Sequence, residues 1–216
     1  MKEAAVFDVD DTLLNGNTGR VYAKVFFKEG IIGLKDAFIF AKFLLSYRLN
    51  HFDYAKAMEK TYSLVEGWDV NEITSLVEKN HEALVRPLIS KKILKELNYH
   101  KNKGRMIILA TNSWYEMIAP LAKDIGADLV LATQAQKKKG VFTGSLEKTC
   151  HGKKKMERVI EAAKEHNIDL KKSYAYSDHY SDRWMLSAVG KAVAVRPDRK
   201  LRKYAKEKKW RVIDSK

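Results

Sequence analysis

The sequence predicts an α/β protein with a Rossmann-like, mostly parallel sheet, helices on both faces and an inserted all-helical cap. From about residue 87 onward, short apolar runs that fit buried strands alternate with amphipathic helical segments. One earlier apolar run, 4–7, is separated from the others by a long block with helical signals only. We therefore expect an α/β core made of residues 1–14 and 87–216, with a helical cap subdomain over residues 15–86.

The predicted core elements follow one another in a regular order. The strand at 4–7 ends in a cluster of acids, and Pro87 marks the restart after the cap. Ser113 and Glu116 have the Ser-x-x-Glu form of a capping box, which predicts that a helix begins there and runs to about 125. The remaining predicted elements are helices at 87–100, 153–166, 181–188 and 199–208, strands at 105–110, 128–131, 173–177, 192–195 and 210–213, and a hairpin at 133–144.

Composition points to a globular protein of a reducing compartment. The 216 residues are 45% hydrophobic, so the chain can bury a core, and its single Cys150 excludes an internal disulfide. The sequence contains no long uncharged apolar stretch of the kind that spans a membrane, and its first residues do not resemble a signal peptide. We expect a cytoplasmic protein.

The formal net charge of +14 is concentrated in segments 137–172 and 191–216, while 15–85 is balanced. A basic surface attracts phosphate-bearing partners, including nucleic acid and anionic lipid. No aromatic residues are interleaved with the lysines in the way that nucleic-acid binding favours, so we expect a solvated basic surface and no nucleic-acid partner. Peripheral membrane contact and the oligomeric state stay open.

Acids and hydroxyls follow three of the predicted strands. They are Asp8, Asp10 and Thr12 after the first strand, Thr111 and Asn112 after the second, and Asp178 and Asp182 after the strand at 173–177. In open α/β sheets, ligands bind at the carboxyl ends of the strands, so we expect these side chains to converge. An acidic turn or a helix cap would explain the first cluster alone. Together with Asp178, however, Asp8 and Asp10 form a site that suits Mg²⁺, which prefers oxygen ligands.

These segments resemble the motifs of the haloacid dehalogenase (HAD) superfamily. VFDVDDTLL (6–14) is similar to its first motif, Asp-x-Asp-x-Thr, and ILATNS (108–113) is similar to its second. CHGKKKMERV (150–159) resembles the lysine motif in the Cys-x-Gly-x-x-Lys form of the phosphoserine-phosphatase-like branch, subfamily IB. YAYSDHYSDRWML (174–186) is similar to the fourth motif, and the cap lies where that branch has its own.

The resemblance implies a Mg²⁺-dependent phosphomonoesterase that hydrolyses a small organic phosphate through an aspartyl-phosphate. In this family pattern Asp8 is the nucleophile, Asp10 the general acid and base, Thr111, Asn112 and Lys155 bind phosphate, Asp8, Asp10 and Asp178 bind the metal, and Thr12 and Asp182 support them. The motif spacing selects Lys155 over Lys153 and Lys154, which we expect to be solvated. Crowding of the carboxylates should raise the pKa of Asp10, as its role requires.

Two features leave the substrate open. Phosphoserine phosphatases place a glutamate for the substrate ammonium shortly after the first motif, whereas residues 15–19 contain no acid here. The segment 31–49 predicts a helix that is apolar nearly all round, which fits packing within the cap, a dimer interface, an apolar substrate tail or a membrane surface. Alternatives to hydrolysis are phosphotransfer by the same chemistry, or a basic nucleic-acid or membrane-surface binding module on a HAD scaffold.

Overall fold

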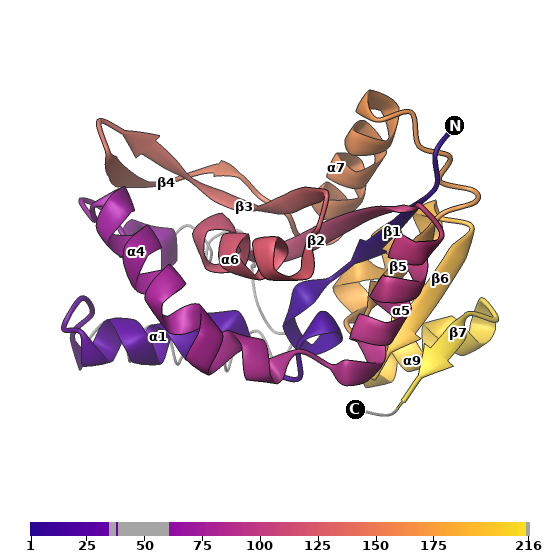
Figure 1. Cartoon of the computed structure of the whole chain (residues 1–216), viewed down its shortest axis with the longest axis horizontal. Coiled ribbons are helices and arrows are strands. Elements are labelled where there is room, and N and C mark those ends of the chain that lie inside the picture. The colour runs from indigo at the N-terminus through magenta and orange to yellow at the C-terminus, as the bar shows by residue number, and fades with distance from the viewer. Residues whose placement is uncertain (35–37, 39–60, 215–216) are drawn as a thin grey trace.

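A seven-stranded sheet forms the centre of the protein in the computed structural model, which describes residues 1–34, 38 and 61–214 (Figure 1). The strands are β1 (Ala4–Phe7), β2 (Met106–Trp114), β3 (Leu129–Lys138), β4 (Val141–Lys148), β5 (Tyr174–Ser177), β6 (Lys191–Val195) and β7 (Arg211–Ile213). Their order across the sheet is β4-β3-β2-β1-β5-β6-β7, and every neighbouring pair is parallel except β3 with β4. The predicted α/β fold with a mostly parallel sheet is confirmed, and β1 lies at its centre.

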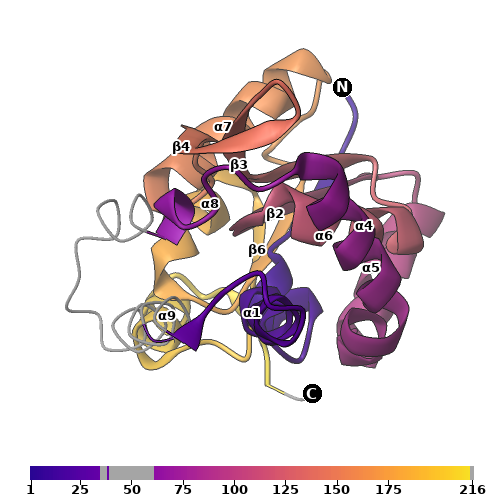
Figure 2. The same cartoon turned by 90° about the vertical axis from the view of Figure 1, so that its left-hand side faces the viewer.

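Helices cover both faces of the sheet. The side chains of β1 point alternately toward one helical layer and the other. Ala5 and Phe7 belong to one buried cluster and Ala4 and Val6 to the other, because successive residues of a strand point to opposite faces. The first cluster packs against α5 (Lys91–Asn102) and α6 (Tyr115–Ile125), and the second against α7 (Gly152–Glu165), α8 (Arg183–Ala188) and α9 (Arg199–Glu207). These two layers are seen from perpendicular directions in Figures 1 and 2.

After β1 the chain makes a tight turn, η1 (Val9–Leu13), and crosses from the sheet into the segment predicted as a cap. It crosses back to the sheet just before α5. The two crossings are hydrogen-bonded to each other, with Asn15 N donating to Leu88 O at 2.7 Å and Ser90 N to Leu13 O at 2.9 Å. Between them lie α1 (Thr18–Lys28), α4 (Val70–Asn80) and the short turns η2 (His81–Val85) and η3 (Arg86–Leu88). Most of the apolar segment predicted at 31–49 lies outside the described residues.

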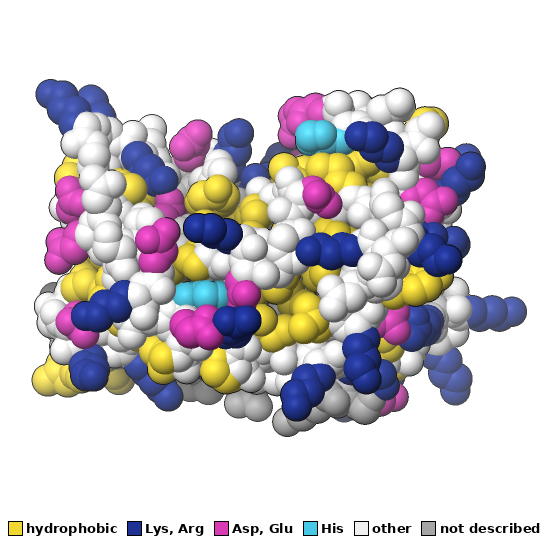
Figure 3. All heavy atoms as spheres, viewed as in Figure 1, with side chains coloured by type: hydrophobic (Ala, Val, Ile, Leu, Met, Phe, Trp, Pro, Cys, Tyr) yellow, Lys and Arg dark blue, Asp and Glu magenta, His cyan; other side chains and the backbone are white. Residues whose placement is uncertain are grey.

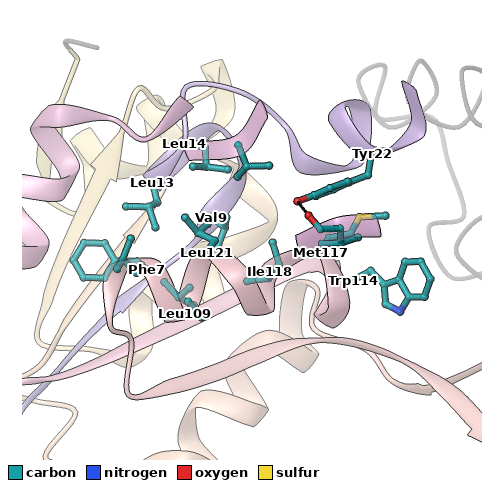
Figure 4. Packing of buried hydrophobic residues seen from close by; sticks show 14 of the residues in the cluster. Phe7, Val9, Leu13, Leu14, Tyr22, Leu109, Trp114, Met117, Ile118 and Leu121 are labelled. Carbon is teal, nitrogen blue, oxygen red and sulfur yellow. Dashed lines mark hydrogen bonds between the residues drawn. The ribbon is translucent and has the colours of Figure 1, made fainter. Parts of the chain in front are cut away.

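The cap segment is also joined to the hairpin of β3 and β4. Gly67 N donates to Phe142 O at 2.8 Å, and Phe142 N donates to Trp68 O at 3.0 Å. Apolar side chains continue this contact toward the sheet: Figure 4 shows Phe7, Val9, Leu13, Leu14, Leu109, Trp114, Met117, Ile118 and Leu121 packed together. Tyr22 of α1 joins this cluster, and its hydroxyl donates to Val77 O at 3.4 Å, so α1 is bound to α4 (Figure 4).

Several predicted boundaries differ from the structure; the strand expected at 128–131, for example, is β3, which runs to Lys138. The helix expected at 87–100 is α5, which begins at Lys91 because Ser90 accepts from Ile93 N and caps it. Strand β2 extends to Trp114, beyond the predicted end at 110. The capping box is wrong: α6 begins at Tyr115 with Trp114 before it, and the Ser113 hydroxyl donates to Asp10. A functional contact at the strand end therefore replaces the expected local cap.

One face of the molecule shows no single basic patch. On the face shown in Figure 3, Lys and Arg side chains are spread among acidic and apolar residues and do not gather in one place. Among the helices of the described ranges, none has both the length and the apolar character that crossing a bilayer requires.

Candidate active site

The carboxyl ends of the three central strands open into one cavity of about 680 Å³. We call the polar residues at its base the floor; they are Asp8, Asp10, Thr111, Lys155, Asp178 and Asp182. Asn112 lines the same cavity, whereas Thr12 is fully buried behind it. The structure thus brings together all the residues that the sequence placed at a site, from β1, β2, β5 and the start of α7.

Lys155 joins two buried carboxylates across the floor. Its Nζ donates to Asp8 Oδ1 at 2.9 Å and to Asp182 Oδ2 at 2.6 Å, and all three residues are buried. Ser177 Oγ also donates to Asp182 Oδ2 at 2.7 Å, which holds this acceptor in place. Asp182, to which the family resemblance gave a supporting role, accepts from the lysine and fixes its position. Lys153 and Lys154 are exposed, as the motif spacing predicted.

Burial and neighbouring charges set the protonation of Asp8 and Lys155. Burial raises the pKa of Asp8 to about 6, although the Lys155 ammonium opposes that rise. Burial alone would lower the pKa of Lys155, but the carboxylates of Asp182 and Asp8 outweigh it and hold that pKa well above its ordinary value. The lysine therefore stays charged beside the reactive carboxyl, where it can also attract a phosphoryl oxygen.

Asp10 faces hydroxyl groups and a backbone amide, and no lysine of the described residues is bonded to it. Thr18 N donates to Asp10 Oδ1 at 2.6 Å, and Thr18 Oγ1 donates to Asp10 Oδ2 at 3.1 Å. Ser113 Oγ donates to the same Oδ2 and accepts from Thr18 Oγ1 at 3.0 Å. Burial raises the pKa of Asp10, while these donors pull it down. Such a carboxyl can give and take a proton.

Thr18 was not expected at the site, and Ser113 was considered there but was given a capping role. Thr18 lies in the first turn of α1, where a hydroxyl fits the pattern of a helix start. Ser113 had been assigned to a capping box. One sequence feature could have placed Ser113 at the site: it belongs to the strand-end segment ILATNS, close behind Thr111.

Asp178 is held from η1, the turn after β1, and meets the nucleophile candidate across the floor. Thr12 Oγ1 donates to Asp178 Oδ1 at 2.9 Å. Burial, with the nearby Asp8 carboxylate, raises the pKa of Asp178 well above its ordinary value. Two carboxylates, one buried and one partly buried, form a donor set that a hard divalent cation would favour in the ionised state.

Side chains alone do not complete a metal site. Within the described ranges no three His, Cys, Asp or Glu side chains cluster closely enough to hold a metal. The Asp10 carboxylate is turned toward Thr18 and Ser113. Mg²⁺ usually keeps several waters and binds one or two carboxylates, so Asp8 and Asp178 fit it with a main-chain carbonyl of the first loop.

The cap side of the cavity is largely apolar, although Asn17, Arg20 and Thr61 also line it. We call its apolar residues the roof; among the described residues they are Ala23, Phe26, Ile32, Tyr62, Leu64, Val65 and Trp68. The Phe26 and Trp68 rings meet edge to face with centroids 5.5 Å apart. Asn17, at the position where the family pattern led us to look for an acid, lines the cavity and caps α1 by accepting from Arg20 N at 3.0 Å.

The comparisons with known proteins agree with this geometry. The family described as haloacid dehalogenase-like hydrolase matches residues 5–187. A phosphoserine phosphatase of Mycobacterium tuberculosis is 33% identical over 216 residues, covering 98% of this chain and 70% of that protein. A histidinol-phosphatase of Neisseria meningitidis is 27% identical over 224 residues and covers both chains completely.

Solved structures share the fold over the whole chain. A Bordetella pertussis protein of unknown function superposes with a TM-score of 0.89 at 25% identity, covering 99% of each chain. A substrate-bound phosphoserine phosphatase superposes with a TM-score of 0.73 at 18% identity, covering 100% of this chain and 94% of the other. At that identity the second likeness supports the fold alone.

Proposed function

Because the chain belongs to the haloacid dehalogenase-like hydrolase family, we propose that it is a Mg²⁺-dependent phosphomonoesterase that acts through an aspartyl-phosphate. The observation that carries this proposal is the floor: Lys155 Nζ lies 2.9 Å from Asp8 Oδ1, and Asp10 is bonded to hydroxyls beside the same cavity. A nucleophile, a separate proton-transfer group and a fixed cation are the parts that phosphoryl transfer needs.

In the first step a carboxylate oxygen of Asp8 attacks phosphorus, and the bond from phosphorus to the ester oxygen breaks. Asp10 gives its proton to the leaving alkoxide; its raised pKa keeps that proton available. In the second step Asp10 takes a proton from water, the water oxygen attacks phosphorus, and Asp8 is released as a carboxylate. Lys155 attracts the phosphoryl oxygens in both steps, and Thr111 and Asn112 bind them from the end of β2.

Phosphatases of this family generally use Mg²⁺, and Asp8, Asp178 and a main-chain carbonyl of the first loop would hold it. When bound, the cation neutralises charge that develops on the phosphoryl group. Burial raises the pKa of both carboxylates, and at Asp178 the nearby Asp8 carboxylate adds to the rise, which supports a cation at this place.

The roof supports a small organic phosphate with an apolar or aromatic body as the substrate. The named relatives act on phosphoserine and histidinol phosphate, but Asn17 has an amide in place of a carboxylate, so it cannot pair with a substrate ammonium as an acid would. Phe26, Tyr62 and Trp68 offer ring surface, against which an apolar body would pack. The single thiol, Cys150, is buried and free, which supports the cytoplasm as the compartment.

A panel of phosphate esters tests the proposal. Purified protein with Mg²⁺ should release phosphate, and excess EDTA should stop the release. Within the panel, kcat/KM for an aryl or acyl-chain phosphate should exceed that for phosphoserine. A tenfold preference for phosphoserine, about 1.4 kcal/mol of transition-state binding, would contradict the apolar substrate. Adding an acceptor alcohol separates hydrolysis from phosphotransfer, because only a transferase forms a new ester.

A further inference from the structure

One arginine outside the cavity holds the loop that carries the reactive acids. Arg196 directly follows β6, and its Nη2 donates to the carbonyl oxygens of Asp11 at 2.8 Å, Thr12 at 2.7 Å and Leu14 at 3.2 Å. Three acceptors of one loop thus converge on one nitrogen, although β6 and β1 are not neighbours in the sheet. The Arg196 side chain therefore adds long-range contacts to the backbone hydrogen bonds within this loop, such as Leu14 N to Val9 O.

The backbone on both sides of this contact is unusual. Arg196 has φ of +42° and Asp11 has φ of +55°, in the left-handed region that residues other than glycine rarely adopt. Arg196 is tied down by its own N–H, which donates to Ile213 O at 2.7 Å. Its Nη1 is buried without a hydrogen-bond partner among the described residues. Backbone strain and a buried unpaired donor persist where the surrounding structure requires the conformation.

The held loop connects directly to the floor. Asp10 precedes Asp11 in the chain, and Thr12, whose carbonyl oxygen Arg196 holds, donates through Oγ1 to Asp178 at 2.9 Å. A shift of this loop would move Asp10 away from Thr18 and Ser113 and would release Asp178 from Thr12. Displacements of about 1 Å in a catalytic group can cost about a hundredfold in rate.

We propose that Arg196 is a positioning residue, which fixes the main chain of Asp11–Leu14 and so sets the place of Asp10 and Thr12. It does not line the cavity and touches no reacting atom. The expected effect on the rate rests on the proposed function. The expected effect on the mobility of the loop does not, because it can be measured without turnover.

The first test measures hydrogen–deuterium exchange of the loop in the Arg196→Asn variant. Asparagine tolerates positive φ, so the substitution removes the guanidinium without adding backbone strain. The loop amides that donate within it, Asp11 N to Gly16 O and Leu14 N to Val9 O, should exchange faster. Lys209→Asn is the matched control, because Lys209 is also basic and left-handed, with φ of +55°, but its side chain is exposed.

The second test is kinetic. In Arg196→Asn, kcat should fall about tenfold while KM changes less than about twofold, because proton transfer and not substrate binding is disturbed. Arg196→Lys should recover part of the loss, and millimolar guanidinium should raise the rate of Arg196→Gly but not that of the wild type or Lys209→Asn. Simple loss of folded protein would not respond to guanidinium.

Wild-type exchange and kcat in Arg196→Asn would overturn the proposal, as would equal losses in Lys209→Asn. If the wild type hydrolysed no ester of the panel, the proposed function would fail. The exchange measurement would then still decide the role of Arg196 in the loop.

Discussion

The floor and the roof of the cavity differ in how their side chains are held. Floor residues are fixed by polar contacts between distant parts of the chain: Lys155 and Asp8 are 147 positions apart, and Ser113 and Asp10 are 103 apart. Roof residues are held by apolar packing and ring contacts such as Phe26 with Trp68. Directional bonds leave little room for substitution, whereas apolar packing tolerates changes of similar volume. The floor should therefore determine rate, and the roof substrate preference.

The largest expected effect is at the nucleophile. Asp8→Asn should reduce kcat by at least about a thousandfold, because an amide oxygen is a poor nucleophile toward phosphorus. Phosphate release measures the loss, and circular dichroism checks the fold. The neighbouring Asp11→Asn, at an exposed position, should keep most of the activity. Near-normal release by Asp8→Asn would show that the floor does not act as proposed.

Three adjacent lysines allow the floor residue Lys155 to be compared with its exposed neighbours Lys153 and Lys154. Lys155→Ala should lower kcat/KM by about a hundredfold or more and should reduce stability, because Asp8 and Asp182 lose a buried cation. Lys153→Ala and Lys154→Ala remove exposed side chains and should stay within about twofold of wild type. Steady-state kinetics and thermal melts measure both effects. Similar losses in all three would mean that general surface charge, and not one bond, matters.

Without metal, the free energy of unfolding of the protein should fall as the pH rises, because of a buried acid of the floor. The pKa of Asp8 is raised from 3.8 to about 6 by burial, so between these values the folded state binds more protons than the unfolded state. The free energy of unfolding should then fall from about pH 4 to pH 6, by at most about 3 kcal/mol from this group. Urea denaturation at each pH measures it.

Asp8→Asn should flatten this decline in stability, with Asp11→Asn as the control for net charge. Adding Mg²⁺ should also reduce the decline in the wild type, since a nearby cation favours the ionised carboxylate. If the free energy of unfolding of Asp8→Asn declined equally with pH, the decline would come from other titrating groups.

The smallest expected effect lies in the roof, where two adjacent phenylalanines differ in position. Phe26 is 4% exposed and lines the cavity, while Phe27 is 45% exposed on the same helix. Phe26→Leu should raise KM for an aryl phosphate about threefold to tenfold with kcat nearly unchanged, because a ring contact worth about 0.5–1.5 kcal/mol is lost. Phe27→Leu should leave both constants unchanged. A fall in kcat without a change in KM would place Phe26 with the floor instead.

Local patterns in the sequence were sufficient for much of the fold. Strand–helix alternation gave the α/β class, because strands buried on both faces read as short apolar runs between amphipathic helices. The position of acids directly after such runs located the site, since parallel strands end at one edge of the sheet. The motif spacing selected Lys155, which is the lysine that reaches Asp8.

Only the tertiary structure decided the strand order and the partners of each polar group. Parallel strands of similar composition do not encode their neighbours, so the central place of β1 between β2 and β5 had to be observed. Ser113 shows the limit most clearly: its spacing to Glu116 fits a local cap, yet its hydroxyl donates to Asp10. Arg196 gave no local signal at all. A hydrogen bond forms with whichever acceptor folding brings closest, and short-range sequence patterns do not record that distance.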